Sequence, residues 1–335
     1  MLSSRNRSFD EDVEIPRLMV QSPYQIFPAV SISSFVLREI YSKDFRGVVH
    51  SVFDRTVNCV SFSDTLITIA KRELGNLPNG ILLDVTSNTD MHSLGIRKGM
   101  GVARKKEWLL IPDASLAISL HNASLWSARR KICPLINLSE IKSNLGVVEK
   151  MTLAKAATLG LKGFVRFKEN IVQCKSISKT TLNNFYESMA KPLGTLIEGI
   201  KTQNLETIKE SACRLVGFGQ GLTPSGDDIL TGLIGSLLVT RCCADDFFYV
   251  MSHEISDIAE SSTNMVSRMF IKHAAVGELA EVLFDMIKAI LTANEDAVVS
   301  STLKVLSLGR TSGIETAFGV LLGLELRLKY LERNI

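Results

Sequence analysis

The feature that most constrains this 335-residue sequence is a glycine-rich segment that runs directly into an apolar stretch. Residues 217–228 read Gly-Phe-Gly-Gln-Gly-Leu-Thr-Pro-Ser-Gly-Asp-Asp, and the ten residues that follow are Ile-Leu-Thr-Gly-Leu-Ile-Gly-Ser-Leu-Leu, too short a run to span a membrane. Glycine permits tight turns and close approach of a ligand to the backbone, and Pro224 disfavours helical geometry at Thr223. We therefore predict a loop that ends at Pro224 and a buried helix that begins immediately after it.

The start of this helix is a candidate ligand site. Free backbone amides at a helix N-terminus favour an anion such as phosphate or carboxylate. Asp227 and Asp228 lie in the predicted first turn, where a carboxylate could cap the helix, hold a cation, or accept hydrogen bonds from a substrate amide. Two interpretations follow: a ligand-binding loop, or a tight turn with a capped helix and no ligand.

A second helix start near the C-terminus repeats the pattern. The sequence Ser225-Gly226-Asp227-Asp228 is followed by Gly232, and Ser312-Gly313-Ile314-Glu315 is followed by Gly319 at the same spacing. A capping box would explain each serine with its acidic partner, but not the three glycines before the first start. Small residues one turn apart, Gly232 with Ser236 and Gly319 with Gly323, would allow the two helix backbones to approach closely. Their N-termini could then line one pocket.

The loop is not a nucleotide-binding fingerprint. A P-loop needs Gly-Lys-Ser or Gly-Lys-Thr where this chain has Gly226-Asp227-Asp228, and no strand of parallel-sheet character is predicted before it. We therefore predict no cofactor and no metal site, although Mg²⁺ bound through one of the two carboxylates stays open. The five histidines have unrelated spacings, which do not suggest a metal cluster or a catalytic triad.

The composition predicts a soluble globular protein without a nucleic-acid or membrane surface. Hydrophobic residues make up 46% of the chain, and its length allows two domains. The N-terminus turns acidic where a signal peptide needs an apolar core, so a cytoplasmic location is expected. The net charge is only +3, and the basic cluster at residues 97–106 fits a solvated hairpin. None of the six cysteines forms a Cys-x-x-Cys pair, which predicts buried free thiols.

The pattern of apolar residues along the sequence predicts an α+β fold, with a β-rich N-terminal half followed by a mostly α-helical C-terminal half. Strands are expected at residues 48–53, 57–62, 80–85, 100–103, 107–111, 115–120 and 163–167, and one helix between residues 64 and 75. After residue 180, apolar residues recur at helical spacing, as at Leu193, Leu196, Ile197 and Ile200. We place the boundary at residues 175–185, which gives a β-rich domain at 1–180 and a helical domain at 181–335 that carries the loop.

At residues 217–228 and in three shorter segments the sequence resembles the AllH family. That family is named for a subunit of oxamate carbamoyltransferase and was long catalogued as a domain of unknown function. The resemblance covers most of the chain, and residues 217–228 are its most specific part. The other matching segments are residues 49–53, 263–264 and 309–313. The resemblance implies a role in anaerobic allantoin breakdown, in which oxalurate and phosphate are converted to oxamate and carbamoyl phosphate. It also implies two other kinds of subunit as partners, one of them related to the FdrA protein.

This chemistry fits the residues of the loop. Oxalurate and carbamoyl phosphate are small anions with amide groups, so helix-start amides would suit the anion and an aspartate could accept from the carbamoyl NH₂. Glycine-loop amides could also face the oxyanion of the transition state. We expect a carbamoyltransferase subunit that requires partner subunits, with Asp227 and Asp228 as catalytic residues. The residues expected to bind substrate or phosphate are Gly219, Gly221, Leu222, Thr223, Ser225, Gly226, Asn264, Thr311, Ser312 and Glu315.

Three points stay open at this stage. The chain could instead be a non-catalytic assembly subunit whose loop caps a helix or contacts a partner. It could also be a Mg²⁺-dependent phosphotransferase that acts alone. The small-residue helix faces are compatible with a homo-oligomer, because the sequence does not distinguish packing within a chain from packing between chains.

Overall fold

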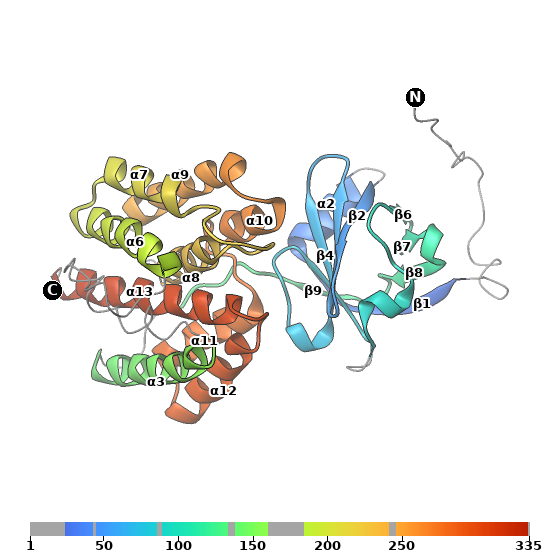
Figure 1. Cartoon of the computed structure of the whole chain (residues 1–335). Coiled ribbons are helices and arrows are strands. Elements are labelled where there is room, and N and C mark those ends of the chain that lie inside the picture. The colour runs from blue at the N-terminus through green and yellow to red at the C-terminus, as the bar shows by residue number, and fades with distance from the viewer. Residues whose placement is uncertain are drawn as a thin grey trace.

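The computed structural model describes residues 24–42, 45–85, 89–132, 138–159, 184–240 and 246–333. These residues form a body of β-strands followed by a body of helices (Figure 1). The predicted α+β fold, with sheet first and helices second, is confirmed. Within the described ranges, none of the helices is both long and apolar enough to cross a bilayer.

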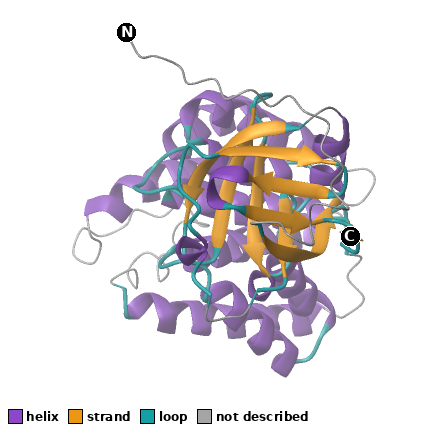
Figure 2. Ribbon diagram, turned by 90° about the vertical axis from the view of Figure 1, so that its right-hand side faces the viewer, coloured by secondary structure: helices purple, strands orange, loops and turns teal. Residues whose placement is uncertain are grey.

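The strands form one sheet that closes on itself. Its order is β5-β4-β3-β2-β6-β7-β8-β1, and β1 also pairs with β5, so eight strands make a barrel, while β9 pairs with β1 beyond the end of β8. Figure 2 looks onto this body, with most of the helices behind the strands. The strands are β1 (Gln25–Ser33), β2 (Arg46–Val52), β3 (Thr56–Ser61), β4 (Leu66–Lys71), β5 (Gly80–Leu83), β6 (Gly101–Lys105), β7 (Trp108–Ile111), β8 (Leu116–Ser119) and β9 (Ser124–Trp126).

The barrel core explains why these segments become strands. The first residues of β2 alternate between exposed and buried, as the period of a strand requires, and the buried Val49 joins an apolar cluster with residues of the other strands. Helix α2 (Ser34–Ser42) follows β1 and adds Val36 and Ile40 to that cluster, both fully buried. Each such side chain stabilises the fold by about 1.5–3 kcal/mol.

One sequence prediction in the barrel is wrong. The helix expected between residues 64 and 75 is strand β4, which pairs with β3 and β5, and only Arg72–Leu74 forms a single 3₁₀ turn. All six residues of β4 are buried, so both faces of the strand are covered and its mainly apolar pattern does not alternate, which makes it hard to distinguish from a buried helix. The strand expected at residues 163–167 lies outside the described residues. The predicted hairpin at the basic cluster is confirmed as β6 and β7.

The helical body is built around α8 (Ser225–Val239), which is buried along nearly its whole length. Helix α13 (Ser312–Arg333) runs beside it (Figure 1). The other helices lie on either side of this pair: α6 (Asn184–Thr202), α7 (Leu205–Leu215), α9 (Asp246–Ser262) and α10 (Met265–Ala274) on one side, and α3 (Leu138–Ala157), α11 (Glu281–Thr292) and α12 (Glu295–Leu306) on the other. Residues 193, 196, 197 and 200 are buried in α6, as their spacing predicts.

Helix α3 belongs to the helical body by its packing, although it precedes the boundary expected at residues 175–185. Its residues Ile141, Leu145 and Val148 join the apolar cluster of α13, and Asn144 Nδ2 donates to the carbonyl oxygens of Ile290 and Ala293 at 3.1 Å each. Most of the expected boundary falls outside the described residues.

The cysteine prediction is right for one of the two cysteines in the described ranges. Cys59 is buried, and burial raises the pKa of its thiol to about 12. Cys213 is exposed, because it lies on the outer face of the amphipathic helix α7. The other four cysteines lie outside the described residues.

Glycines hold α8 and α13 together at close range. A Cβ atom on Gly232 would lie 2.1 Å from the carbonyl oxygen of Thr316, and one on Gly319 would lie 2.1 Å from that of Ile229. Gly323 faces Ser236 in the same way. The prediction that the two similar helices pack through their small residues is confirmed, and the packing brings their N-termini together.

The barrel is anchored to the helical body by polar contacts. The backbone amide and the Nδ2 atom of Asn76 donate to Glu281 Oε2, at 2.9 and 2.8 Å, and the Glu281 amide donates to the Asn76 carbonyl at 2.8 Å. A second contact pairs Arg268 of α10 with Asp64, which follows β3, at 2.9 Å.

Candidate functional site

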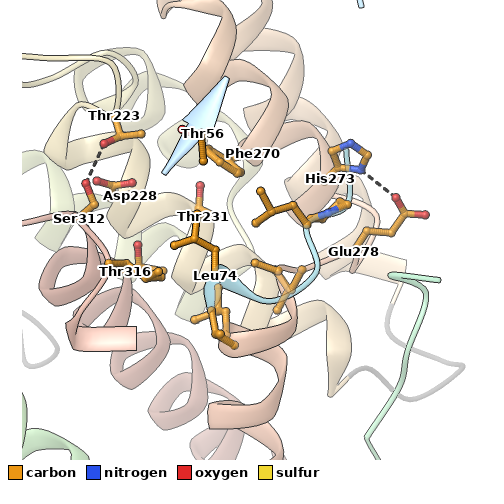
Figure 3. A pocket seen from close by; sticks show the side chains of 17 residues that line it. Thr56, Leu74, Thr223, Asp228, Thr231, Phe270, His273, Glu278, Ser312 and Thr316 are labelled. Atoms are coloured by element: carbon orange, nitrogen blue, oxygen red, sulfur yellow. Dashed lines mark hydrogen bonds and ion pairs between the residues drawn. The ribbon is translucent and has the colours of Figure 1, made fainter. Parts of the chain in front are cut away.

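A cavity of about 200 Å³ lies where the starts of α8 and α13 meet the barrel. Most of its wall is apolar, and several hydroxyl groups surround Asp228 on one side. Figure 3 shows Asp228 with Thr223, Ser312 and Thr316 on that side, and His273 with Glu278 on the other. The barrel supplies Thr56, Leu74, Leu77 and Pro78 to the wall.

The glycine-rich loop has the backbone that its sequence predicts. Gly217, Gly219 and Gly221 have φ angles of 73°, 131° and 94°, which side-chain-bearing residues rarely adopt. A Cβ atom on Gly219 would also lie 2.6 Å from the amide nitrogen of Ser225. Helix α8 begins at Ser225, directly after Pro224 as expected, and no side chain caps it. The pure capping interpretation of this helix start therefore does not hold for Ser225.

Asp227 fastens the loop to the helix. Its Oδ1 atom accepts from the Gly217 amide at 2.7 Å, and its Oδ2 atom accepts from the Thr263 hydroxyl at 2.5 Å. Burial raises the pKa of Asp227, and hydrogen bonds from Gly217, Thr263 and Ser267 act in the opposite direction. The residue is 1% exposed and is not among those that line the cavity. These contacts indicate that Asp227 anchors the loop and the segment before α10 to the start of α8.

Asp228 faces the cavity. It is 7% exposed, and its Oδ2 atom is buried without a hydrogen-bond partner among the described residues. Burial raises the pKa of Asp228 well above its usual range, and the negative charges of Glu315 and Asp227 raise it further, against hydrogen bonds from Ser312 and Thr223. A protonated Asp228 can donate to a ligand carbonyl, and an ionised one can accept from a ligand amide. A buried oxygen without a partner is a costly arrangement that a ligand would relieve.

The two helix starts are joined by their hydroxyl groups. Thr223 Oγ1 and Ser312 Oγ lie 2.7 Å apart, and both residues line the cavity. Glu315, one turn into α13, is 2% exposed and acts on Asp228 through its charge. The acids at equivalent positions of the two similar helices are thus close enough to influence each other.

The other predicted binding residues do not line the cavity. Asn264 caps α10, where its Oδ1 atom accepts from the amides of Val266 and Ser267 at 3.0 and 3.2 Å. Leu222 packs against the small apolar cluster between the barrel and α10. The full set of predicted residues outside the lining is Gly219, Gly221, Leu222, Ser225, Gly226, Asn264, Thr311 and Glu315.

His273 and Glu278 line the cavity and were not predicted as functional residues. His273 Nδ1 lies 2.8 Å from Glu278 Oε2, and Glu278 Oε1 accepts from Arg129 Nε at 3.1 Å. No spacing rule pairs positions 273 and 278, because the chain turns between them at Gly277, which has a φ of 74°. A glycine soon after the end of an amphipathic helix was the available signal.

A second, more polar cleft of about 500 Å³ adjoins His273 and Glu278. It lies between α2 and the β3–β4 turn on the barrel side and α10 on the helical side, and it contains basic and acidic side chains in similar number. Several of these are paired: Arg268 with Asp64 at 2.9 Å and Lys272 with Glu260 at 2.9 Å. His273 and Glu278 are lining residues of both the cavity and the cleft.

In the described part of the chain, one group of side chains has metal-ligand spacing. Potential ligand atoms of Asp54, Asp90 and His92 lie within 4.8 Å of one another, and all three residues are exposed. None of them lines the cavity, and Asp90 Oδ1 already accepts from the His92 amide at 2.9 Å. Exposed acidic groups of this kind are common without a metal.

Two family models match the chain. The model described as oxamate carbamoyltransferase subunit AllH matches residues 215–324, which include the glycine-rich loop, Asp228, His273 and Ser312. The model of the AllH family N-terminal domain matches residues 28–125, which form the barrel. Both matched regions contribute to the wall of the cavity. No solved structure matches the chain.

Proposed function

This chain belongs to the AllH family, and on that premise we propose that it is a subunit of an oxamate carbamoyltransferase that binds the carbamoyl group in the cavity at the starts of α8 and α13. The observation that carries the proposal is Asp228. It is a buried acid with an oxygen atom that lacks a partner among the described residues, and it lines a cavity beside the hydroxyl groups of Thr223 and Ser312.

The electrostatics of the cavity favour a neutral group inside it. Among the described residues, no lysine or arginine lines this cavity, whereas Asp228 does and Glu315 lies close enough to affect its pKa. A phosphate or carboxylate next to these acids would lack compensation in a medium of low dielectric constant. A carbamoyl group carries no charge and has both a carbonyl acceptor and an NH₂ donor, which suit Asp228 and the hydroxyl groups.

The anionic part of the substrate would lie against the glycine-rich loop. None of the backbone amides of residues 219–223 donates a hydrogen bond to another described residue. Thr223, at the end of this run, lines the cavity, so an anion on the loop can be continuous with a carbamoyl group beside Asp228. Backbone amides next to a helix start are common donors to phosphate and to developing oxyanions.

The reaction that fits these groups is carbamoyl transfer between nitrogen and phosphate. A phosphate oxygen attacks the carbamoyl carbon of oxalurate, a C–O bond forms, and the C–N bond to oxamate breaks. In this proposal the cavity holds the carbamoyl group, the apolar wall excludes water, and partner subunits, an FdrA-like protein among them, complete the enzyme.

The test is ligand-induced stabilisation of the purified chain. Thermal unfolding is measured with phosphate, carbamoyl phosphate, oxamate and oxalurate, for the wild type, Asp228→Asn and the control Asp257→Asn, which makes the same change at an exposed position of α9. A ligand at 100 times its Kd stabilises the native state by about 2.7 kcal/mol. We expect stabilisation by a carbamoyl compound in the wild type and the control, and its loss in Asp228→Asn. Equal stabilisation of all three proteins, or of none, contradicts the proposal.

A further inference from the structure

We infer that His273, oriented by Glu278, is the proton-transfer residue of the carbamoyl transfer, an inference that rests on the proposed function. His273 lies across the cavity from Asp228, on α10 (Figure 3). It is 5% exposed, and its Nε2 atom is buried with no hydrogen-bond partner among the described residues. Two unpartnered polar atoms, one on Asp228 and one on His273, therefore belong to residues that line the same small cavity.

The contacts of the ring determine which nitrogen is available. Burial alone would raise the pKa of Glu278, but the hydrogen bonds and charges of His273 and Arg129 outweigh it and lower that pKa. An ionised carboxylate can only accept, so His273 Nδ1 carries a proton and donates it to Glu278 Oε2 at 2.8 Å. The Nε2 atom is then the one that can exchange a proton with a substrate.

Arg129 and the edge of an aromatic ring fix the pair in place. Arg129 Nε donates to the second Glu278 oxygen at 3.1 Å, so the carboxylate cannot rotate without losing a bond. Phe35 of α2 packs edge-on against the imidazole, with ring centroids 4.8 Å apart. A residue of the barrel and one of the segment that follows it thus position a histidine of the helical body.

The place of His273 between two spaces suits proton exchange. It lines the mostly apolar cavity, where the carbamoyl group would sit, and also the more polar cleft. A proton taken from or given to the substrate would be exchanged on the polar side, while the apolar wall of the cavity keeps water from the reacting carbon.

His273 would supply the proton that the leaving nitrogen needs. When a phosphate oxygen adds to the carbamoyl carbon and the C–N bond breaks, the electron pair of that bond stays on the oxamate nitrogen. The imidazolium form of His273 donates its Nε2 proton to this nitrogen and becomes neutral, and Nδ1 keeps its proton towards Glu278. In the reverse direction, neutral Nε2 accepts a proton from the amide nitrogen as it attacks carbamoyl phosphate.

The positioning role of Glu278 has a spectroscopic test. In Glu278→Gln, the amide oxygen should face Arg129, which can only donate, so the NH₂ group faces His273 Nδ1 and the ring proton moves to Nε2. Nitrogen NMR of the imidazoles in the full chain, assigned with His273→Gln, reports the tautomer. We expect the Nδ1-protonated ring in the wild type and the Nε2-protonated ring in Glu278→Gln. An Nε2-protonated ring in the wild type overturns the inference.

Turnover of the complex that the chain forms with its partner subunits tests the proton transfer itself. His273→Gln should lower kcat by about 10²–10⁴-fold, the usual contribution of a general acid or base, with little change in KM. His253→Gln, a control on α9 outside both spaces, should leave kcat unchanged. If His273→Gln keeps the kcat of the wild type, the inference is overturned. This holds even if ligands still stabilise the wild-type chain through Asp228. If the proposed function itself fails, no carbamoyl compound stabilises the wild type.

Discussion

Replacing Gly232 with alanine is the most direct test of how the two helix starts are brought together. The added Cβ atom would lie 2.1 Å from the Thr316 carbonyl oxygen and 2.9 Å from the Val320 amide nitrogen, both backbone atoms of α13. Ordinary contacts begin at 3.4 Å, so α13 must retreat locally by more than about 1 Å. Overpacking of this kind costs about 1–3 kcal/mol, and a rigid facing backbone places the cost at the upper end. Alanine also has a helix propensity about 1 kcal/mol more favourable than that of glycine, which offsets part of the overpacking cost.

We therefore expect Gly232→Ala to lower the free energy of unfolding of the helical body by about 2 kcal/mol. The assay is urea unfolding followed by the circular dichroism of the helices. Gly146→Ala in α3 is the matched control, because a Cβ atom there would meet nothing within 4 Å and should stabilise the protein by up to about 1 kcal/mol. If Gly232→Ala is as stable as the control, the close packing of α8 on α13 is not what holds the two helix starts together.

Two further predictions concern the adjacent aspartates. Because the pKa of folded Asp228 is raised, the folded state holds its proton more tightly than the unfolded chain. The free energy of unfolding should therefore fall as pH rises from about 4 towards the folded pKa, by up to about 1.4 kcal/mol per pH unit. Asp228→Asn should remove this pH dependence from urea unfolding measured across that range, and an unchanged pH slope in the variant would show that the acid is not buried as described. Asp227→Ala should destabilise the protein by about 2–4 kcal/mol, since it leaves the Gly217 amide and the Thr263 hydroxyl without their acceptor. Asp227→Asn should cost less, and equal losses of stability in the two variants would contradict the anchoring role.

The parts of the site that depend on local geometry were predictable from the sequence. Glycines that need positive φ and a proline that fixes the helix start act within a few residues, so the loop and the beginning of α8 follow from residues 217–225 alone. The repeated spacing of small residues also predicted the contact between α8 and α13, because close backbone approach requires the absence of side chains on both partners.

The difference between Asp227 and Asp228 was not predictable in this way. Adjacent residues on a helix project about 100° apart, so they must face different surroundings, but the sequence does not say which one faces which. Here Asp227 turns to the loop amide of Gly217, and Asp228 turns to the cavity. Both were predicted as catalytic residues, and the contacts of Asp228 are those that the proposed function uses.

The long-range features were not predicted from the sequence, for a different reason. Strand β1 was not predicted, and its partners β8 and β9 lie more than 80 residues further along the chain, so no local pattern reveals that it closes the barrel. The pair of His273 with Glu278 depends on a turn, and its orientation depends on Arg129, which is more than 140 residues away. Such contacts are set by the tertiary fold, and a single sequence carries no periodic signal for them.

The barrel explains why the loop alone would not make a site. The helical body supplies the polar groups, Asp228 and the hydroxyls of Thr223 and Ser312, whereas the barrel supplies Leu74, Leu77 and Pro78 to the opposing wall. Without that wall Asp228 would face water, its pKa would lose the main cause of its shift, and a neutral carbamoyl group would compete with solvent for the same hydrogen bonds. The contact of Asn76 with Glu281 joins the segment that carries this wall to the start of α11. In the proposed function the two matched family regions therefore act together, because the carbamoyl site of the helical body depends on the exclusion of water by the barrel.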